Sequence, residues 1–177
     1  MVIFRYYRQL VDQVDKWTAE MAQRYKTHLA CRKGCDLCCQ RKLTVTAVEA
    51  YNIARLFGSL SATVQRAVRK EKRSCAFLVD GACSVYAARP VICRTYGLPS
   101  LNRNEKNEGE ISWCELNFTN VPDDFGFQAD GIIDVDTLNV KLEGVNGLFL
   151  KESGLSQQRI AMDEIPDLDP GVLQRRH

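Results

Sequence analysis

The sequence predicts a helix-dominated α+β fold, mainly α with one small β-hairpin, and a cysteine-rich core with irregular loops. Three observations lead to this prediction. An amphipathic stripe runs from residue 3 to 29, a turn-forming Asp80-Gly81 pair separates two short β-prone runs, and all eight cysteines fall within residues 31–114. A chain of 177 residues is long enough to bury a core without staples, so we expect residues 1–177 to form a single domain.

The composition is that of an ordinary globular protein, with 45% hydrophobic and 26% charged residues and a formal net charge of +2. No run approaches the roughly 18 apolar residues of a membrane helix, so we expect no membrane partner. Arg5, Arg8 and Asp12 interrupt the segment where a signal peptide would carry its apolar run. These features predict a cytoplasmic protein.

The N-terminal segment, residues 1–30, is predicted to be an amphipathic helix, with the helical pattern running from residue 3 to 29. Its apolar residues recur at spacings of three and four and form one stripe, opposite a charged face. The stripe consists of Ile3, Tyr7, Leu10, Val14, Trp17 and Met21. We expect it to face the core, and the end of the helix leads directly into Cys31.

Two further helices are predicted after the first cysteines. Thr46 and Glu49 fit a capping box, which predicts a helix from about residue 47 to 57 that ends near Gly58. A second helix, residues 61–73, ends in cations that complement its macrodipole. A nucleic-acid patch is the alternative for this run, but it is disfavoured because no aromatic residues interleave and the chain is nearly neutral.

The run CAFLVDGACSVY predicts a tight hairpin, because Asp80-Gly81 is a favoured type I′ turn. The hairpin would place Cys75 and Cys83 at similar heights on opposite strands. Arg89-Pro90 then opens a short helix that bears Cys93, with the proline in its first turn.

The polar run at 102–110 predicts a surface loop. Residues 31–114 thus form the cysteine-bearing region, and the cysteine-free residues 115–177 are expected to supply packing and a tail. Within them Asp136 is predicted to cap a helix over 137–151, with Gly154 beyond its end. The tail from Asp163 is expected to be loosely ordered.

Four cysteines within nine residues are unlike isolated core thiols, because clustered thiolates are good ligands for soft metals. In an exported chain, eight cysteines would instead suggest a disulfide framework. In a reducing compartment the same count indicates metal or redox chemistry. Since the chain is predicted to be cytoplasmic, we expect the cysteines to form a metal-centred core.

The spacing of the first four cysteines brings their sulfurs together in either of two conformations. If residues 31–39 were helical, all four would lie within roughly 100° of arc. Gly34 favours a tight loop over part of the segment instead. Adjacent Cys38 and Cys39 diverge in any regular structure, so both rarely serve one mononuclear ion. They would bind different ions or different iron corners of one cluster, or one would stay free.

The spacing favours a polynuclear iron–sulfur centre, such as a [4Fe–4S] cluster, over zinc. Only Cys35 and Cys38 have the two-residue spacing of a zinc knuckle, and the later four are well separated. With only two histidines, His28 and His177, a histidine-rich site is excluded. Cations flank the sulfurs and would offset thiolate charge. They are Arg32, Lys33, Arg41, Lys42, Arg89 and Arg94.

The run CRKGCDLCC resembles the signature of the CxxCxxCC (YkgJ-like) cysteine cluster family, and CAFLVDGACSVYAARPVICRTYGLP resembles its second block. Together the two blocks cover about residues 31–98. One departure is that three residues, not two, separate Cys31 from Cys35. The resemblance implies chelation of iron or Zn²⁺. The implied ligands are Cys31, Cys35, Cys38, Cys39, Cys75, Cys83 and Cys93, with Cys114 outside both blocks.

Several functions remain open at this point. The leading hypothesis is a cytosolic metal-binding protein whose cysteines chelate iron, as an iron–sulfur cluster, or zinc. The resemblance also extends to distant relatives of flagellin lysine methylases, so a redox or modifying enzyme is an alternative, although no glycine-rich nucleotide loop is present. Metal delivery or sensing is the third hypothesis. A metal ion is the one predicted partner, and the sequence identifies no protein partner.

Overall fold

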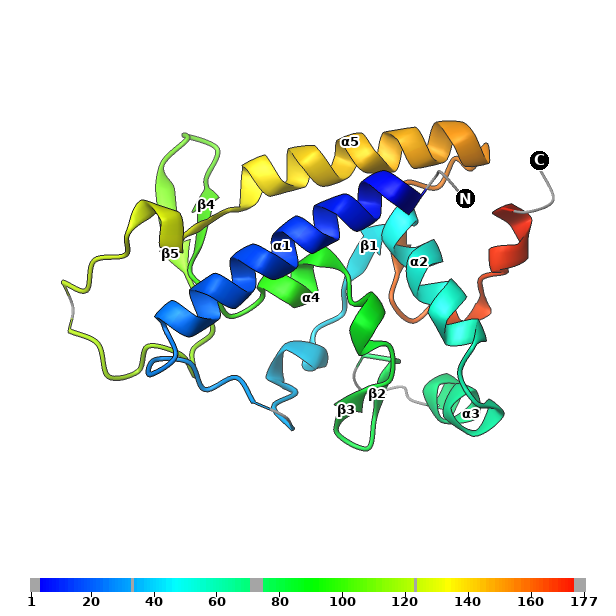
Figure 1. Ribbon diagram of the computed structural model, residues 1–177, viewed down its shortest axis with the longest axis horizontal. Coiled ribbons are helices and arrows are strands. Elements are labelled where there is room, and N and C mark those ends of the chain that lie inside the picture. The colour runs from blue at the N-terminus through cyan, green and yellow to red at the C-terminus, as the bar shows by residue number, and fades with distance from the viewer. Residues whose placement is uncertain (1–3, 33, 71–74, 123, 174–177) are drawn as a thin grey trace.

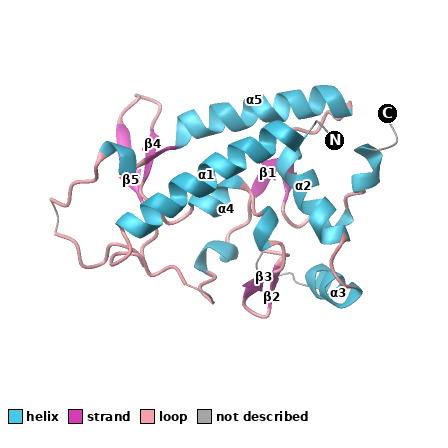
Figure 2. Ribbon diagram, in the orientation of Figure 1, coloured by secondary structure: helices cyan, strands magenta, loops and turns pink. Residues whose placement is uncertain are grey.

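The computed structural model describes residues 4–32, 34–70, 75–122 and 124–173. Within them five α-helices dominate three sheets of two or three short strands, which confirms a helix-dominated α+β fold (Figure 1, Figure 2). The helices are α1 (Arg5–Arg24), α2 (Ala47–Gly58), α3 (Ala62–Lys70), α4 (Val91–Thr95) and α5 (Val135–Ser153). The strands are β1 (Thr44–Thr46), β2 (Leu78–Val79), β3 (Ala82–Cys83), β4 (Ser100–Arg103), β5 (Gly109–Ser112), β6 (Ile133–Asp134) and β7 (Arg159–Ala161).

The core lies where α1, α2 and α5 meet. α1 and α5 run side by side, and α2 packs against the C-terminal half of α5 (Figure 1). Phe149 of α5 joins all three helices, since its ring centroid lies 5.6 Å from that of Phe4 and 5.8 Å from that of Tyr51. The predicted stripe of α1 faces this core through Tyr7 and its helical neighbours, although the helix ends at Arg24, five residues earlier than predicted.

The predicted capping box is present at the start of α2. The backbone N–H and the hydroxyl of Thr46 both donate to Glu49 Oε2, at 2.9 and 2.8 Å. The other carboxylate oxygen, Oε1, accepts the backbone N–H of Val91 at 2.8 Å. Glu49 therefore fixes the start of α4 as well as that of α2. Thr46 also ends β1, whose antiparallel partner β7 comes from far along the chain.

The Asp80-Gly81 turn forms as predicted, with φ of 50° and 72°, the positive values that a type I′ turn requires. It joins β2 to β3 in a two-stranded sheet. The register pairs Cys83 with Leu78, so Cys75 lies beyond the ladder rather than opposite Cys83. The helix after it, α4, has Pro90 as its N-cap rather than in its first turn.

The polar run at 102–110 is not the predicted loop but a second hairpin. β4 and β5 pair antiparallel, and β6 adds to β4 in parallel. Asn104 Oδ1 accepts the backbone N–H groups of Lys106 and Glu108 and so closes the turn, where Asn107 has φ of 62°. Because most side chains of this hairpin are exposed, its sequence lacks the apolar alternation that marks a half-buried strand.

Two predictions about the C-terminal third need correction. α5 begins at Val135, and its cap is Asp134, whose side chain accepts the Thr137 N–H at 2.9 Å, rather than Asp136. Gly154 does end the helix, in the left-handed conformation. The segment from Asp163 to Leu173 is packed rather than loose, with Ile165 and Leu173 buried. Residues 71–73, predicted to end the helix now seen as α3, lie outside the described residues.

None of the described helices is long and apolar enough to cross a membrane.

Candidate metal centre

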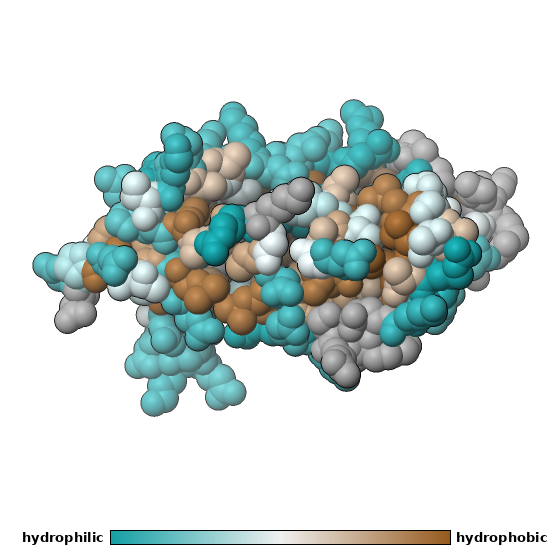
Figure 3. Space-filling model, turned by 90° about the horizontal axis from the view of Figure 1, so that it is seen from below, coloured by the Kyte–Doolittle hydropathy of each residue, from teal (hydrophilic) through white to brown (hydrophobic). Residues whose placement is uncertain are grey.

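The cysteines lie on segments below the helical core, around the β2–β3 hairpin (Figure 1). Viewed from below, hydrophobic residues form an interrupted band along this side of the molecule, with hydrophilic residues around it (Figure 3). Cys31 and Cys35 precede the short 3₁₀ helix η2 (Leu37–Gln40), and Cys38 and Cys39 lie within it. Cys75 precedes β2, and Cys83 lies on β3. Cys93 lies on α4, and Cys114 follows β5. All eight are free thiols. The helical alternative for residues 31–39 is wrong, since Gly34 adopts φ of 90° in a loop.

Five of these thiols approach one another, and we call them the inner group: Cys38, Cys39, Cys75, Cys83 and Cys93. A charge on Cys38 raises the pKa of Cys75, of Cys83 and of Cys93, which places their sulfurs within electrostatic range. A backbone hydrogen bond, Cys75 N–H to the Cys39 carbonyl at 2.7 Å, joins η2 to the hairpin. Four separate chain segments thus supply the inner group.

The other three cysteines, Cys31, Cys35 and Cys114, form an outer group. Burial raises the pKa of Cys31, and charges on Cys35, on Cys114 and on Cys38 of the inner group raise it further. Asn117 Nδ2 donates to the Cys31 sulfur at 3.7 Å and to the Gly97 carbonyl at 2.7 Å. Gly97 has φ of 90°, and a Cβ there would lie 3.5 Å from the Cys31 sulfur. The positive φ favours glycine at this position, and a Cβ there would also lie only 3.1 Å from Asn117 Nδ2.

Among the residues that the structure describes, no three His, Cys, Asp or Glu side chains stand at the spacing of a ready-made metal site. The structure therefore gathers the inner thiols on one side of the molecule without setting out a coordination geometry.

Burial is the largest influence on the pKa of three inner thiols, Cys75, Cys83 and Cys93. It raises the pKa of Cys75 and of Cys83, and that of Cys93 to about 12, because a thiolate loses solvation there. Hydrogen bonds oppose this effect. The backbone N–H of Phe77 lowers the pKa of Cys75, and that of Val85 lowers the pKa of Cys83. In both cases the donor lies two residues after the cysteine. Such N–H···S bonds stabilise the thiolate form that a metal requires.

The adjacent pair in η2 shares a hydrogen bond. That bond lowers the pKa of Cys38 to about 6 and raises the pKa of Cys39. One thiolate of the pair therefore forms readily while its neighbour keeps its proton. This asymmetry makes Cys38 the inner thiol best prepared to bind a cation.

Arg89 is a cation whose charge acts on the pKa of three inner thiols. Its guanidinium lowers the pKa of Cys38, of Cys83 and of Cys93. Stacking holds it in place, since its Cζ lies 3.6 Å from the ring centroid of Tyr86, which is itself 62% exposed. Arg89 can thus offset thiolate charge, as predicted for the flanking cations.

The other flanking cations lie differently. Arg94 is buried and donates to Asp15 Oδ1 at 2.6 Å and to the carbonyls of Arg89 and Ala87, so it positions the backbone around α4. Arg41 lies over the ring of Tyr96, with its Cζ 5.5 Å from the centroid. Lys33 and His177 lie outside the described residues.

His28 packs as an aromatic side chain, stacked on Phe118 with ring centroids 5.7 Å apart. Asn117, which anchors Cys31, was missed by sequence reasoning. Its partner lies 86 residues away, and nothing in the local pattern marks it.

Free thiols from four segments, supported by N–H···S bonds and an arginine, define a cysteine-cluster protein. Residues 30–115 match the model of the CxxCxxCC family, described as a putative zinc- or iron-chelating domain. The matched segment is similar to this domain and holds all eight cysteines, including Cys114. Zinc or iron is the metal that this description gives, in agreement with the sequence analysis. No curated protein and no solved structure gave a significant match.

Proposed function

We propose that the protein binds iron as an iron–sulfur centre and that the inner group supplies the ligands. The observation that carries this proposal is the approach of five free thiols from four separate segments. Iron–sulfur clusters are held by cysteine thiolates, with one cysteine available to each iron corner. When bound, such a centre supplies one-electron chemistry or a structural crosslink.

Two features of the thiols favour a cluster over a single zinc ion. The adjacent Cys38 and Cys39 suit different iron corners better than one tetrahedral ion. N–H···S bonds and the charge of Arg89 offset the negative charge that a thiolate-bound cluster brings. Free thiols also fit a cytoplasmic location, which is part of the proposal.

The test is to purify the protein without oxygen and to quantify iron, zinc and acid-labile sulfide in one sample. We expect iron and sulfide in similar amounts, with visible absorption from sulfur-to-iron charge transfer. Cys83→Ser should lose at least half of the bound iron, whereas Cys114→Ser, the matched control from the outer group, should retain it. A colourless protein with zinc and no sulfide would replace the cluster by a zinc site, and no bound metal would reject both.

Metal delivery is a second candidate, and the exposure of Cys31 and Cys35 favours it. Exposed thiols can pass a metal to a partner protein by ligand exchange. Under delivery, a chelator should remove the metal quickly and leave the protein folded. A structural centre should instead resist the chelator, and its loss should lower the melting temperature.

A further inference from the structure

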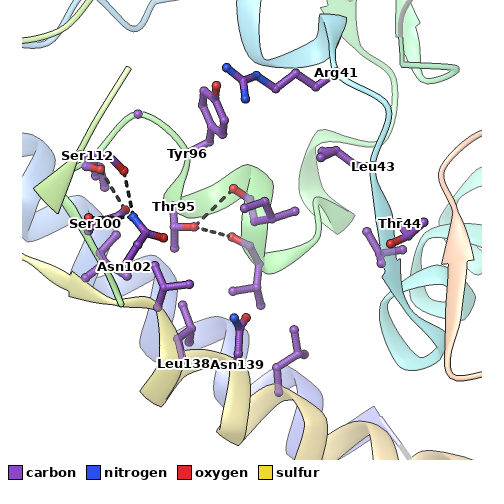
Figure 4. Close-up of a pocket in the computed structure, with 18 of the residues that line it drawn as sticks. Arg41, Leu43, Thr44, Thr95, Tyr96, Ser100, Asn102, Ser112, Leu138 and Asn139 are labelled. Carbon is purple, nitrogen blue, oxygen red and sulfur yellow. Dashed lines mark hydrogen bonds between the residues drawn. The ribbon is translucent and has the colours of Figure 1, made fainter. Parts of the chain in front are cut away.

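A cavity of about 720 Å³ lies beside α4, and Cys114 of the outer group is among the residues that line it (Figure 4). Its walls come from the segment that leads into β1, from α4, from the β4–β5 hairpin and from α5. Val91, Ile92 and Thr95 of α4 line it, whereas Cys93 between them belongs to the inner group. The volume lies within the roughly 300–1,000 Å³ of typical small-molecule sites. The cavity is therefore large enough for an organic ligand separate from the metal.

Much of the lining is apolar. Ile133, Leu138 and Leu142 are buried side chains on the α5 side of the cavity, and Trp113, 40% exposed, adds a large aromatic surface. An apolar ligand body would cover the exposed surface of Trp113 and remove it from water, which is favourable at about 25 cal/mol per Å².

The charged groups of the cavity are mostly cations. Arg41, Lys42 and Arg159 line it, against one carboxylate, Glu49. Both oxygens of Glu49 are occupied, by Thr46 and by the backbone N–H of Val91, and the residue is buried. Arg159 is engaged with Thr44 and Glu143. Arg41, which lies over the ring of Tyr96, and Lys42 are both exposed, and neither forms an ion pair in the described part of the chain.

Polar side chains opposite these cations add orientation. Asn102 Nδ2 donates to the Ser112 hydroxyl oxygen at 2.9 Å and to the Ser100 carbonyl at 3.1 Å. This fixes the Asn102 amide and leaves its oxygen, and the Ser112 hydroxyl proton, available to a ligand. Asn102 and Ser112 lie across the cavity from Leu43 and Thr44 (Figure 4).

We propose that this cavity binds a small organic anion with an apolar body, its negative group at Arg41 and Lys42 and its body against Trp113 and α5. The volume, lining and charge of the cavity support this ligand, and its binding does not require a bound metal. Recognition combines a few placed polar groups with an apolar wall, the usual composition of such sites.

Anilinonaphthalene sulfonate is a suitable probe, because it joins an apolar aromatic body to an anionic group and fluoresces when it leaves water. Phenylnaphthylamine has a similar body without the charge. We expect saturable binding of the sulfonate to the folded protein, at least roughly tenfold tighter than binding of the uncharged compound. Equal affinities for the two compounds would overturn the assignment of an anion.

Two pairs of variants locate the site. Lys42→Glu should weaken sulfonate binding roughly tenfold, whereas Lys16→Glu, an exposed lysine on α1 away from the cavity, should not change it. Asn139→Trp should fill the cavity and weaken binding at least roughly tenfold, and Val140→Trp, the next residue and 74% exposed, should not.

Each variant is first checked for a native melting temperature, so that binding to unfolded chain is excluded. If both tryptophan variants bind the sulfonate as the parent does, the probe lies elsewhere and the cavity is rejected. The lysine pair tests the same site without adding bulk, so the proposal stays testable even if Asn139→Trp disturbs folding.

Discussion

Tyr7 places a phenolic hydroxyl in the core, where no group in the described part of the chain hydrogen-bonds to it. Burial raises the pKa of this hydroxyl, with a further contribution from the charge of Glu49. A buried polar atom without a partner costs roughly 1–3 kcal/mol of stability. The Tyr7 ring is buried in the core, so the loss of stability comes from the hydroxyl oxygen alone.

Replacing Tyr7 by Phe is therefore expected to raise the free energy of unfolding by about 1 kcal/mol. Urea denaturation measures the change. Tyr25→Phe is the matched control, because the Tyr25 hydroxyl donates to the Gly131 carbonyl at 3.2 Å, and its loss should lower stability by about 1 kcal/mol. If Tyr7→Phe destabilises as much as the control does, the Tyr7 hydroxyl has a partner after all.

Glu49 predicts a pH dependence. Burial raises its pKa above the ordinary 4.5, so the folded state holds this proton more tightly than the unfolded chain does. Its contribution to stability is complete below about pH 4.5 and is lost as the pH rises through the higher folded value. Glu49→Gln should flatten this decline, measured by urea denaturation as the pH rises above 4.5. An unchanged slope would mean that another group titrates.

For individual residues, the local spacing of the sequence predicts some contacts and does not predict others. The Thr46–Glu49 pair is readable because capping residues lie three positions apart. The second role of Glu49, as acceptor for Val91, spans 42 residues and leaves no local trace. The anchor from Asn117 to Cys31 is equally distant. Asp134 and Asp136 are both good caps, and only the backbone path distinguishes them.

α4 is the element on which the metal centre most depends. It carries Cys93 toward the inner group, and Arg94 ties it to α1 through Asp15. Arg94 has only 6% of its side chain exposed, so loss of its partner would leave a buried charge without compensation. The helix is short, with five residues, and these contacts rather than its own backbone hydrogen bonds fix its position.

Asp15→Asn is expected to lower the free energy of unfolding by about 1–3 kcal/mol and to reduce the metal bound per chain, because Cys93 is displaced with α4. Urea denaturation and metal analysis of the same preparations measure both effects. Asp12→Asn removes the same charge from an exposed position of the same helix and should change neither. Retention of full metal by Asp15→Asn would separate α4 from the site.

Elements with a strong local rule could be predicted, and the others could not. Asp80-Gly81 adopts the positive φ values that its residues favour, so the β2–β3 hairpin follows from two letters of sequence. The β4–β5 hairpin has exposed faces and a turn closed by Asn104, and neither feature gives an apolar period. The cavity cannot be predicted from the sequence, since its walls come from segments that are far apart in the chain.

The whole molecule combines a helical core with a thiol-bearing side that has few long elements. α1, α2 and α5 bury large side chains around Phe149, whereas η2, β2–β3 and α4 are each five residues or shorter. A bound metal would add crosslinks where packing is weakest. The core and the thiol side should therefore respond differently when the metal is removed.

Hydrogen exchange tests this difference. Removal of the metal with a chelator under reducing conditions should increase amide exchange in residues 34–40 and 75–98, and it should leave α2 and α5 protected. Uniform loss of protection would make the metal necessary for the whole fold. No change in either region would place the metal away from the inner group.

The pairing of β1 with β7 has a consequence for biosynthesis. Residues 44–46 cannot pair until residues 159–161 have been synthesised, so this sheet forms late in translation. All eight sulfurs emerge earlier, the last at position 114. During that interval the completed fold does not yet cover the sulfurs, because one of its sheets has still to form.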